Sequence, residues 1–154
     1  MTENNQNTPL PHVQINAQYI KDLSFEAPGM PFSLLDLKTP PEININIDLK
    51  ADKNENDKTF TLDLSLRLEA KAKETGKTLF LCELIYGTLV TLDVPEQARE
   101  PILMVEVPHL IFPFARAVIA NVIREAGLPS LQISPIDFAG LYQAKLAEKE
   151  KAKA

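Results

Sequence analysis

A long hairpin between Phe60 and Val94 constrains the fold of this chain more than any other stretch. Its first half alternates without a break, as in a strand with one dry and one wet face. The residues on the dry face are Phe60, Leu62, Leu64, Leu66, Leu68 and Ala70. The turn from Glu74 to Lys77 then contains Gly76, which can adopt a positive φ.

The return strand, Thr78 to Tyr86, is apolar on both faces and is interrupted only by Glu83. Because the first half of the hairpin has a wet side, helices packed on the sheet can cover only one of these two faces. We therefore expect the second face to lie against another chain or to be held ready for a ligand.

Two more strands are expected before the hairpin, so that four successive strands form an antiparallel sheet. The first has about a dozen residues, with Lys21 and Ile20 as exceptions to its alternation. Its expected apolar face comprises Val13, Ile15, Ala17, Tyr19, Leu23 and Phe25. A proline-containing stop precedes a crossover loop at 32–41. The alternation from Ile43 to Lys50 predicts the second strand.

After Pro95 the apolar period becomes helical. Residues 96–107 are compatible with a short helix despite the proline inside it, and residues 109–126 predict a longer one. Because Pro113 fits only in a first turn, the regular part of the longer helix is expected to start near Phe112. Gly127 ends it.

A last helix is expected to start at Ser134, with the serine as cap and a proline in the first position. Its residues from Lys145 onward are rich in Lys, Glu and Ala, which is typical of a frayed, solvated tail. We expect three parts: a disordered polar arm at 1–11, a single domain at 12–146 and a flexible tail at 147–154.

Composition restricts the compartment and the partners. The chain has 154 residues and a net charge of −5, and its Lys-rich end makes the body before it more acidic still. An acidic body argues against nucleic-acid binding and favours a basic partner. The single cysteine, Cys82, suggests a reducing compartment. The polar start is not a signal peptide, and no apolar run approaches the roughly 20 residues of a membrane span, so we expect a cytoplasmic protein without membrane insertion.

Residues that carry chemistry are sparse. His12 and His109 lack a second ligand at metal spacing, and Cys82 lies between apolar residues, where a thiol is inert. Asp22 and Glu26 share one strand face but lie roughly 13 Å apart, too far for a paired-carboxylate site. We expect no metal, no cofactor and no catalytic set. An acidic sheet face and surplus apolar surface remain, and oligomer packing and a peptide groove explain the latter about equally well.

Four strings resemble the signatures of the SecB family, the bacterial protein-export chaperones, in the same order along the chain. They are Tyr19 to Pro28, Phe80 to Glu83, Leu110 to Arg116 and Leu131 to Leu141. The resemblance implies an α+β fold, with a four-stranded antiparallel Greek-key sheet and C-terminal helices packed on one face. It also implies a homotetramer, a dimer of dimers, in which the side of the fourth strand bearing Cys82, Leu84 and Tyr86 faces the helices and the inter-dimer contact.

The resemblance implies two kinds of binding. In the family, the acids matching Asp22, Glu26 and Glu83, together with the residue matching Leu81, receive the basic, zinc-binding C-terminal tail of the SecA motor, so the zinc belongs to the partner. Unfolded preproteins occupy hydrophobic channels beneath the crossover loop. Our candidates for preprotein binding are Phe25, Met30, Phe32, Leu34, Leu35, Phe138 and Tyr142.

The sequence is thus interpreted as a holdase that keeps preproteins competent for translocation and delivers them to SecA, without catalysis. The alternative is a non-chaperone oligomeric adaptor that uses its acidic face for one fixed basic partner. An enzyme with a hydrophobic pocket is a third reading, which lacks any acid/base or nucleophile constellation.

Overall fold

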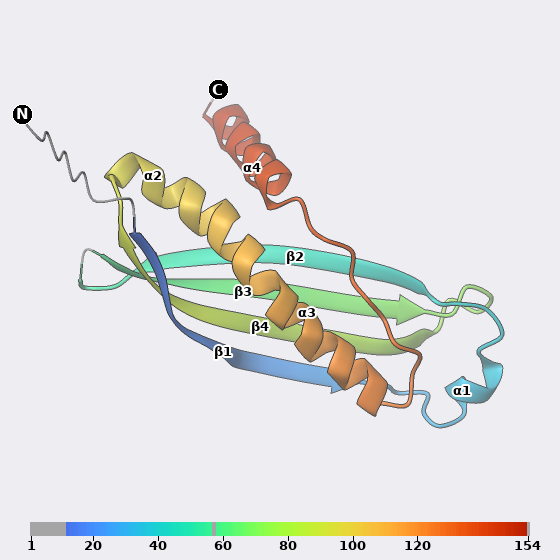
Figure 1. Cartoon of the computed structure of the whole chain (residues 1–154). Coiled ribbons are helices and arrows are strands. Elements are labelled where there is room, and N and C mark those ends of the chain that lie inside the picture. The colour runs from blue at the N-terminus through green and yellow to red at the C-terminus, as the bar shows by residue number, and fades with distance from the viewer. Residues whose placement is uncertain (1–11, 57, 154) are drawn as a thin grey trace, which may run out of the picture.

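The computed structural model describes residues 12–56 and 58–153, and shows an antiparallel sheet crossed on one face by a long helical run (Figure 1). The strands are β1 (His12–Glu26), β2 (Glu42–Lys53), β3 (Thr59–Lys71) and β4 (Thr78–Asp93). Their order, β1-β4-β3-β2, is that of a Greek key. The predicted α+β class is confirmed, whereas the polar arm expected at 1–11 lies outside the described residues.

The core lies between the central hairpin and the helices. The alternating apolar residues of β3 are at most 6% exposed, because both neighbouring strands and the helical layer cover them. The predicted turn is confirmed, with Gly76 at φ 70°. On β4, the inward residues from Phe80 to Leu92 complete the same layer.

Two bulges in β1 change the expected assignment of its faces. The pairing with β4 slips between Ile15 and Ala17 and again between Ile20 and Asp22. A bulge adds one residue, so the alternation inverts after it. Ala17 and Tyr19 therefore lie on the outer face, opposite to the prediction. Ile20 takes a place on the helix-covered side.

The helical run is longer than predicted. It consists of α2 (Glu96–Pro101), a π-helical segment η1 (Ile102–Glu106) and α3 (Val107–Glu125). The predicted start near Phe112 is wrong, because Pro113 lies inside α3. A proline costs one helical hydrogen bond, but the fully buried Val107 and Ile111 hold the preceding turns on the sheet. Gly127, at φ 81°, follows the end of α3 as expected.

Residues 96–125 form a helix that is long and apolar enough to cross a membrane by length and composition alone. The sequence had suggested no apolar stretch of that length. Core helices of soluble proteins pass the same test, and the buried residues of this helix belong to the core that also contains the sheet.

Two more helices complete the fold. α1 (Ser33–Asp36) is a single turn within the crossover loop, and α4 (Phe138–Ala152) returns past β2 (Figure 1). The cap of α4 is Asp137, whose side chain accepts a hydrogen bond from the Gly140 amide, so the cap predicted at Ser134 is three residues too early. Most of the tail expected to be flexible is helical.

Candidate functional site

The acids predicted to bind SecA lie together on the outer face of the sheet, the face opposite the helices. After the second bulge of β1, Asp22 pairs with Ile85 and Glu26 with Leu81. Ser24, between those acids, pairs with Glu83. Because directly paired residues project to the same side, the structure brings Asp22, Glu26, Leu81 and Glu83 onto two adjacent strands.

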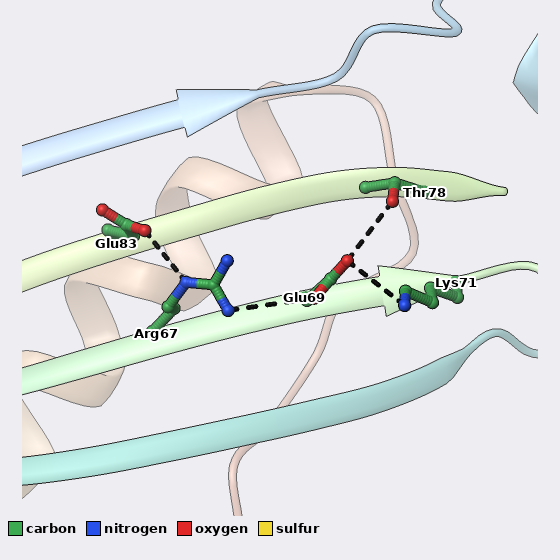
Figure 2. A network of polar contacts seen from close by, with 5 residues as sticks. All are labelled: Arg67, Glu69, Lys71, Thr78 and Glu83. Carbon is green, nitrogen blue, oxygen red and sulfur yellow. Dashed lines mark hydrogen bonds and ion pairs between the residues drawn. The ribbon is translucent and has the colours of Figure 1, made fainter.

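Glu83 belongs to a chain of polar contacts across β3 and β4 (Figure 2). The Arg67 Nε donates to a Glu83 oxygen at 3.0 Å, and its Nη1 lies 3.8 Å from Glu69. Glu69 also lies 3.6 Å from the Lys71 Nζ and accepts a 3.3 Å hydrogen bond from the Thr78 hydroxyl. Arg67 thus lies between two carboxylates, and among the described residues only Glu69 has other donors close to it.

The acids of β1 have a different setting. Among the described residues, no ion pair within 4.0 Å involves Asp22 or Glu26, and both are exposed. Their neighbour Lys21 is instead held by Asp63 of β3 at 2.6 Å, and that hydrogen bond raises the pKa of Lys21. Because Lys21 already pairs with Asp63, Asp22 and Glu26 remain available to a cation of a binding partner.

A hollow of about 280 Å³ opens on this face, lined by residues of all four strands. Asp22, Asp48, Glu83 and Arg67 contribute charged groups, and Ser65 contributes a small side chain. Such a hollow, acidic by three residues to one, suits a basic side chain better than an anion.

The candidates for preprotein binding on the crossover loop form an exposed apolar surface. Phe32 and Leu35 are 72% and 79% exposed, and Leu34 is also exposed. Met30 is half-buried at the base of the loop. Phe25 is half-buried too, and its ring stacks on Phe80 at 5.7 Å between centroids.

The two candidates on the last helix differ from the loop residues. Phe138 is 3% exposed and packs edge-on against Phe112, with ring centroids 5.9 Å apart, so in this structure it belongs to the core. Tyr142 is half-buried one turn later and lines a small gap with Met104 and Ile47. Only Tyr142 presents part of its side chain to solvent.

The residues expected at the oligomer interface lie inside one protomer. Cys82, Leu84 and Tyr86 are 0%, 1% and 8% exposed, because the helical layer covers this side of β4. An interface requires surface that the protomer leaves accessible, so these side chains are core residues. Burial raises the pKa of the Cys82 thiol to about 11, which makes it unreactive at neutral pH.

The sequence reasoning missed two cavities beside the crossover loop. One of about 200 Å³ lies between Leu37, Pro40 and the Leu128–Leu131 segment that follows α3. Another of about 340 Å³ adjoins the turn between β3 and β4. The signal was present as leucines and prolines within both the crossover loop and the 128–131 segment, but these two segments meet only in the fold.

The described part of the chain was also compared with the requirements of a metal site. No group of three or more His, Cys, Asp or Glu residues within it could hold a metal ion. His109 lies on the exposed side of α3, in the lining of an open pocket with Glu106 and Asp137.

Comparison with known protein families shows which family this chain belongs to. The model of the family described as "Preprotein translocase subunit SecB" matches residues 4–149. The chain belongs to the SecB family. This family consists of chaperones of protein export, which are not enzymes.

Individual SecB proteins are similar along nearly the whole chain. The protein-export protein SecB of Agrobacterium fabrum is 46% identical over 145 residues, which cover 94% of this chain and 88% of the relative. That of Paramagnetospirillum magneticum is 44% identical over 140 residues, with 90% and 88% covered.

The fold also has a solved counterpart. A SecB-like chaperone of Mycobacterium tuberculosis, solved in complex with a peptide from an antitoxin, superposes with a TM-score of 0.64 at 10% identity. The match covers 80% of this chain and 90% of the other. At this identity the likeness concerns the fold.

Proposed function

We propose that this chain is a holdase of the export pathway, which binds unfolded preproteins in the cytoplasm and delivers them to the SecA motor. Membership of the SecB family is the observation that carries the proposal. The separation of an apolar loop from an acidic sheet face supports the division of labour between client and motor.

Clients bind along the crossover loop and the surfaces next to it. The exposed side chains of Phe32 and Leu35 offer apolar area, and burying such area stabilises a complex by about 25 cal/mol per Å². The residues proposed to contact the client are Phe25, Met30, Phe32, Leu34, Leu35 and Tyr142. The cavities beside the loop extend this surface toward Leu37 and Leu131. Phe138 is not among these contacts, because it is buried in the core against Phe112.

The motor docks on the outer face. Asp22, Glu26 and Glu83 attract the basic C-terminal tail of SecA, and Leu81 offers an apolar contact beside Glu26. The proposed client surface centres on the crossover loop and the proposed motor surface lies on the outer face of the sheet, so client and motor can be held together. Release then follows when the motor competes for the client, and no cofactor in this chain is needed.

Assembly into a homotetramer brings several client surfaces together. Exposed apolar residues on the helix-covered side are the proposed contacts, notably Ile20 on β1 and Phe114 on α3, which are 50% and 55% exposed. Several weak sites on one particle act cooperatively through effective concentration. In light scattering, the wild type should have the mass of four chains, and Phe114→Arg should reduce it without unfolding the protomer. An unchanged mass for this variant would move the interface elsewhere.

The test of chaperone activity is an aggregation assay. Purified protein should suppress aggregation of a chemically unfolded client and leave the folded client unbound. An oligomeric adaptor would do neither, while still binding a basic partner through its acidic face. Failure to suppress aggregation, with tail binding intact, would therefore favour the adaptor.

The docking surface is tested by a charge-neutralising pair. Asp22→Asn with Glu83→Gln should weaken binding of the SecA tail about tenfold and reduce its salt dependence, while client capture remains. Asp93→Asn with Glu125→Gln removes the same charge elsewhere and should have little effect. An equal loss of client capture in the first pair would show that the two surfaces are not separate.

A further inference from the structure

Arg67 lies among acidic residues on the outer face of the sheet. Three rows of paired residues cross the sheet there from β1 to β2. They are Glu26–Leu81–Glu69–Asn44, Ser24–Glu83–Arg67–Asn46 and Asp22–Ile85–Ser65–Asp48. Arg67 is the only basic residue in these rows, which contain five acids.

The contacts of Arg67 are unequal. Its Nε makes a 3.0 Å hydrogen-bonded ion pair with Glu83, whereas its Nη1 lies 3.8 Å from Glu69, beyond hydrogen-bond distance (Figure 2). The guanidinium presents several donors in a rigid fork, so a small side-chain movement can exchange the stronger contact for the weaker one. Both side chains of the Arg67–Glu83 pair are nearly half exposed, at 44% and 46%, so neither is locked by packing.

The position of this pair matters because both residues line the hollow described above. A basic side chain that enters the hollow meets Asp22 and Asp48 as well as Glu83. At Glu83, however, it meets an acid that already has a cation. Asp48 has one too, since the Lys145 Nζ lies 3.2 Å from it.

We propose that Arg67 is an internal competitor of the basic partner: it occupies Glu83 in the free protein and moves to Glu69 when the partner docks. This proposal rests on the proposed function, in which the outer face receives the SecA tail. It adds a specificity-determining residue that acts on Glu83 from within the chain.

The competition favours one class of partner. A single cation that displaces Arg67 exchanges one ion pair for another and gains little. A partner with several basic residues also neutralises Asp22 and Glu26, which make no ion pair within 4.0 Å with any described residue. Arg67 therefore selects tails with clustered positive charge against isolated lysines on other proteins.

The first test compares two charge-neutralising variants by calorimetry with the zinc-loaded SecA tail peptide. Arg67→Gln should bind the peptide about two- to fivefold more tightly, the range expected for an exposed ion pair. Lys50→Gln removes the same charge from the outer face of β2, roughly 16 Å from Glu83 by strand geometry. At physiological salt its effect should stay below about 1.5-fold, because this distance exceeds the Debye length of about 8 Å.

The second test is a double-mutant cycle. Glu69→Gln removes the alternative site for Arg67, so it should weaken tail binding about twofold in the wild-type background. In the Arg67→Gln background the same change should have no such effect. Client capture should be unchanged in all variants.

The results separate the two proposals. Weaker binding by Arg67→Gln would make Arg67 a direct contact of the partner and overturn its role as competitor. Equal gains in Arg67→Gln and Lys50→Gln would also overturn it, because the effect would then be one of net charge. If neither the wild type nor any variant binds the tail, docking on the outer face is itself wrong.

Discussion

The two faces of β4 carry similar apolar residues but serve different purposes. On the helix-covered face, Cys82, Leu84 and Val90 are at most 1% exposed. On the outer face, Leu81 and Ile85 are half-buried without any layer above them, because side chains of neighbouring strands shield them. One face is covered by a helical layer, and the other is screened by its own polar neighbours.

This difference relocates the surplus apolar surface that the sequence indicated. We expected it on the second face of β4, the crossover loop and the helix stripe; among the described residues, most of the large exposed apolar side chains lie on the crossover loop, the β1 edge and α3, and none lies on β4. They include Phe32, Leu35, Ile20, Leu110 and Phe114. The outer face of the sheet thus presents mainly charged groups at its surface, which explains how one protomer can offer both an apolar and an acidic surface.

The largest expected effect comes from placing the same charge on each face of β4. Leu84→Arg buries an unpaired cation and should cost more than about 4 kcal/mol of unfolding free energy, which unfolds many domains of this size. Leu81→Arg projects outward near Glu26 and Glu69 and should stay within about 1 kcal/mol. Urea denaturation followed by circular dichroism measures both. A folded Leu84→Arg protomer of reduced assembly would place Leu84 at an interface and break the comparison.

A smaller effect tests packing on the outer face. The Tyr19 ring lies over Gly87 so closely that an added Cβ would overlap it. Gly87→Ala should therefore cost about 1–2 kcal/mol, because the ring must leave its place.

In the control background, Gly87→Ala should change the unfolding free energy in the opposite direction. In a Tyr19→Ala background, Gly87→Ala should stabilise the protein by about 0.5 kcal/mol, since alanine restricts the unfolded chain more than glycine does. If Gly87→Ala costs the same in both backgrounds, the Tyr19 ring is not the cause.

The smallest effect concerns pH and the inner face. Burial, with a lesser contribution from Glu83, raises the pKa of Cys82 from 9.0 to about 11. A thiol whose pKa is raised by folding stabilises the native state fully below pH 9, and this contribution is lost as the pH rises toward 11. The unfolding free energy should fall by about 1 kcal/mol between pH 8 and pH 10 on account of this group.

Cys82→Ala provides the comparison for this pH dependence. The variant lacks the thiol, so the part of the alkaline decline due to Cys82 should disappear, whatever the variant's stability at pH 8. Parallel declines in the two proteins, measured by urea unfolding at each pH, would contradict a buried thiol.

Much of the fold follows from patterns along the chain. The unbroken alternation of β3, the glycine turn after it and the terminal Gly127 are local features that the structure confirms. The two exceptions in β1, Ile20 and Lys21, also held information: they adjoin the second bulge. If Ile20 and Lys21 had been interpreted as a reversal of the alternation, Tyr19 would have been predicted on the outer face.

Other features depend on contacts between distant parts of the chain. Pro113 argued for a later helix start, yet burial on the sheet holds the turns before it in the helix. The pairing of Arg67 with Glu83 required the register of β3 against β4, which no pattern within either strand specifies.

The sequence by itself determined where this chain alternates, turns and stops, because backbone sterics and side-chain periodicity act over a few residues. It also determined the family, through strings that keep their order. The tertiary structure decided which apolar face is covered, which residues remain exposed and which acid meets which base. Those outcomes depend on strand register and on a helix laid across the sheet, and both arise from the packing of segments far apart in the sequence.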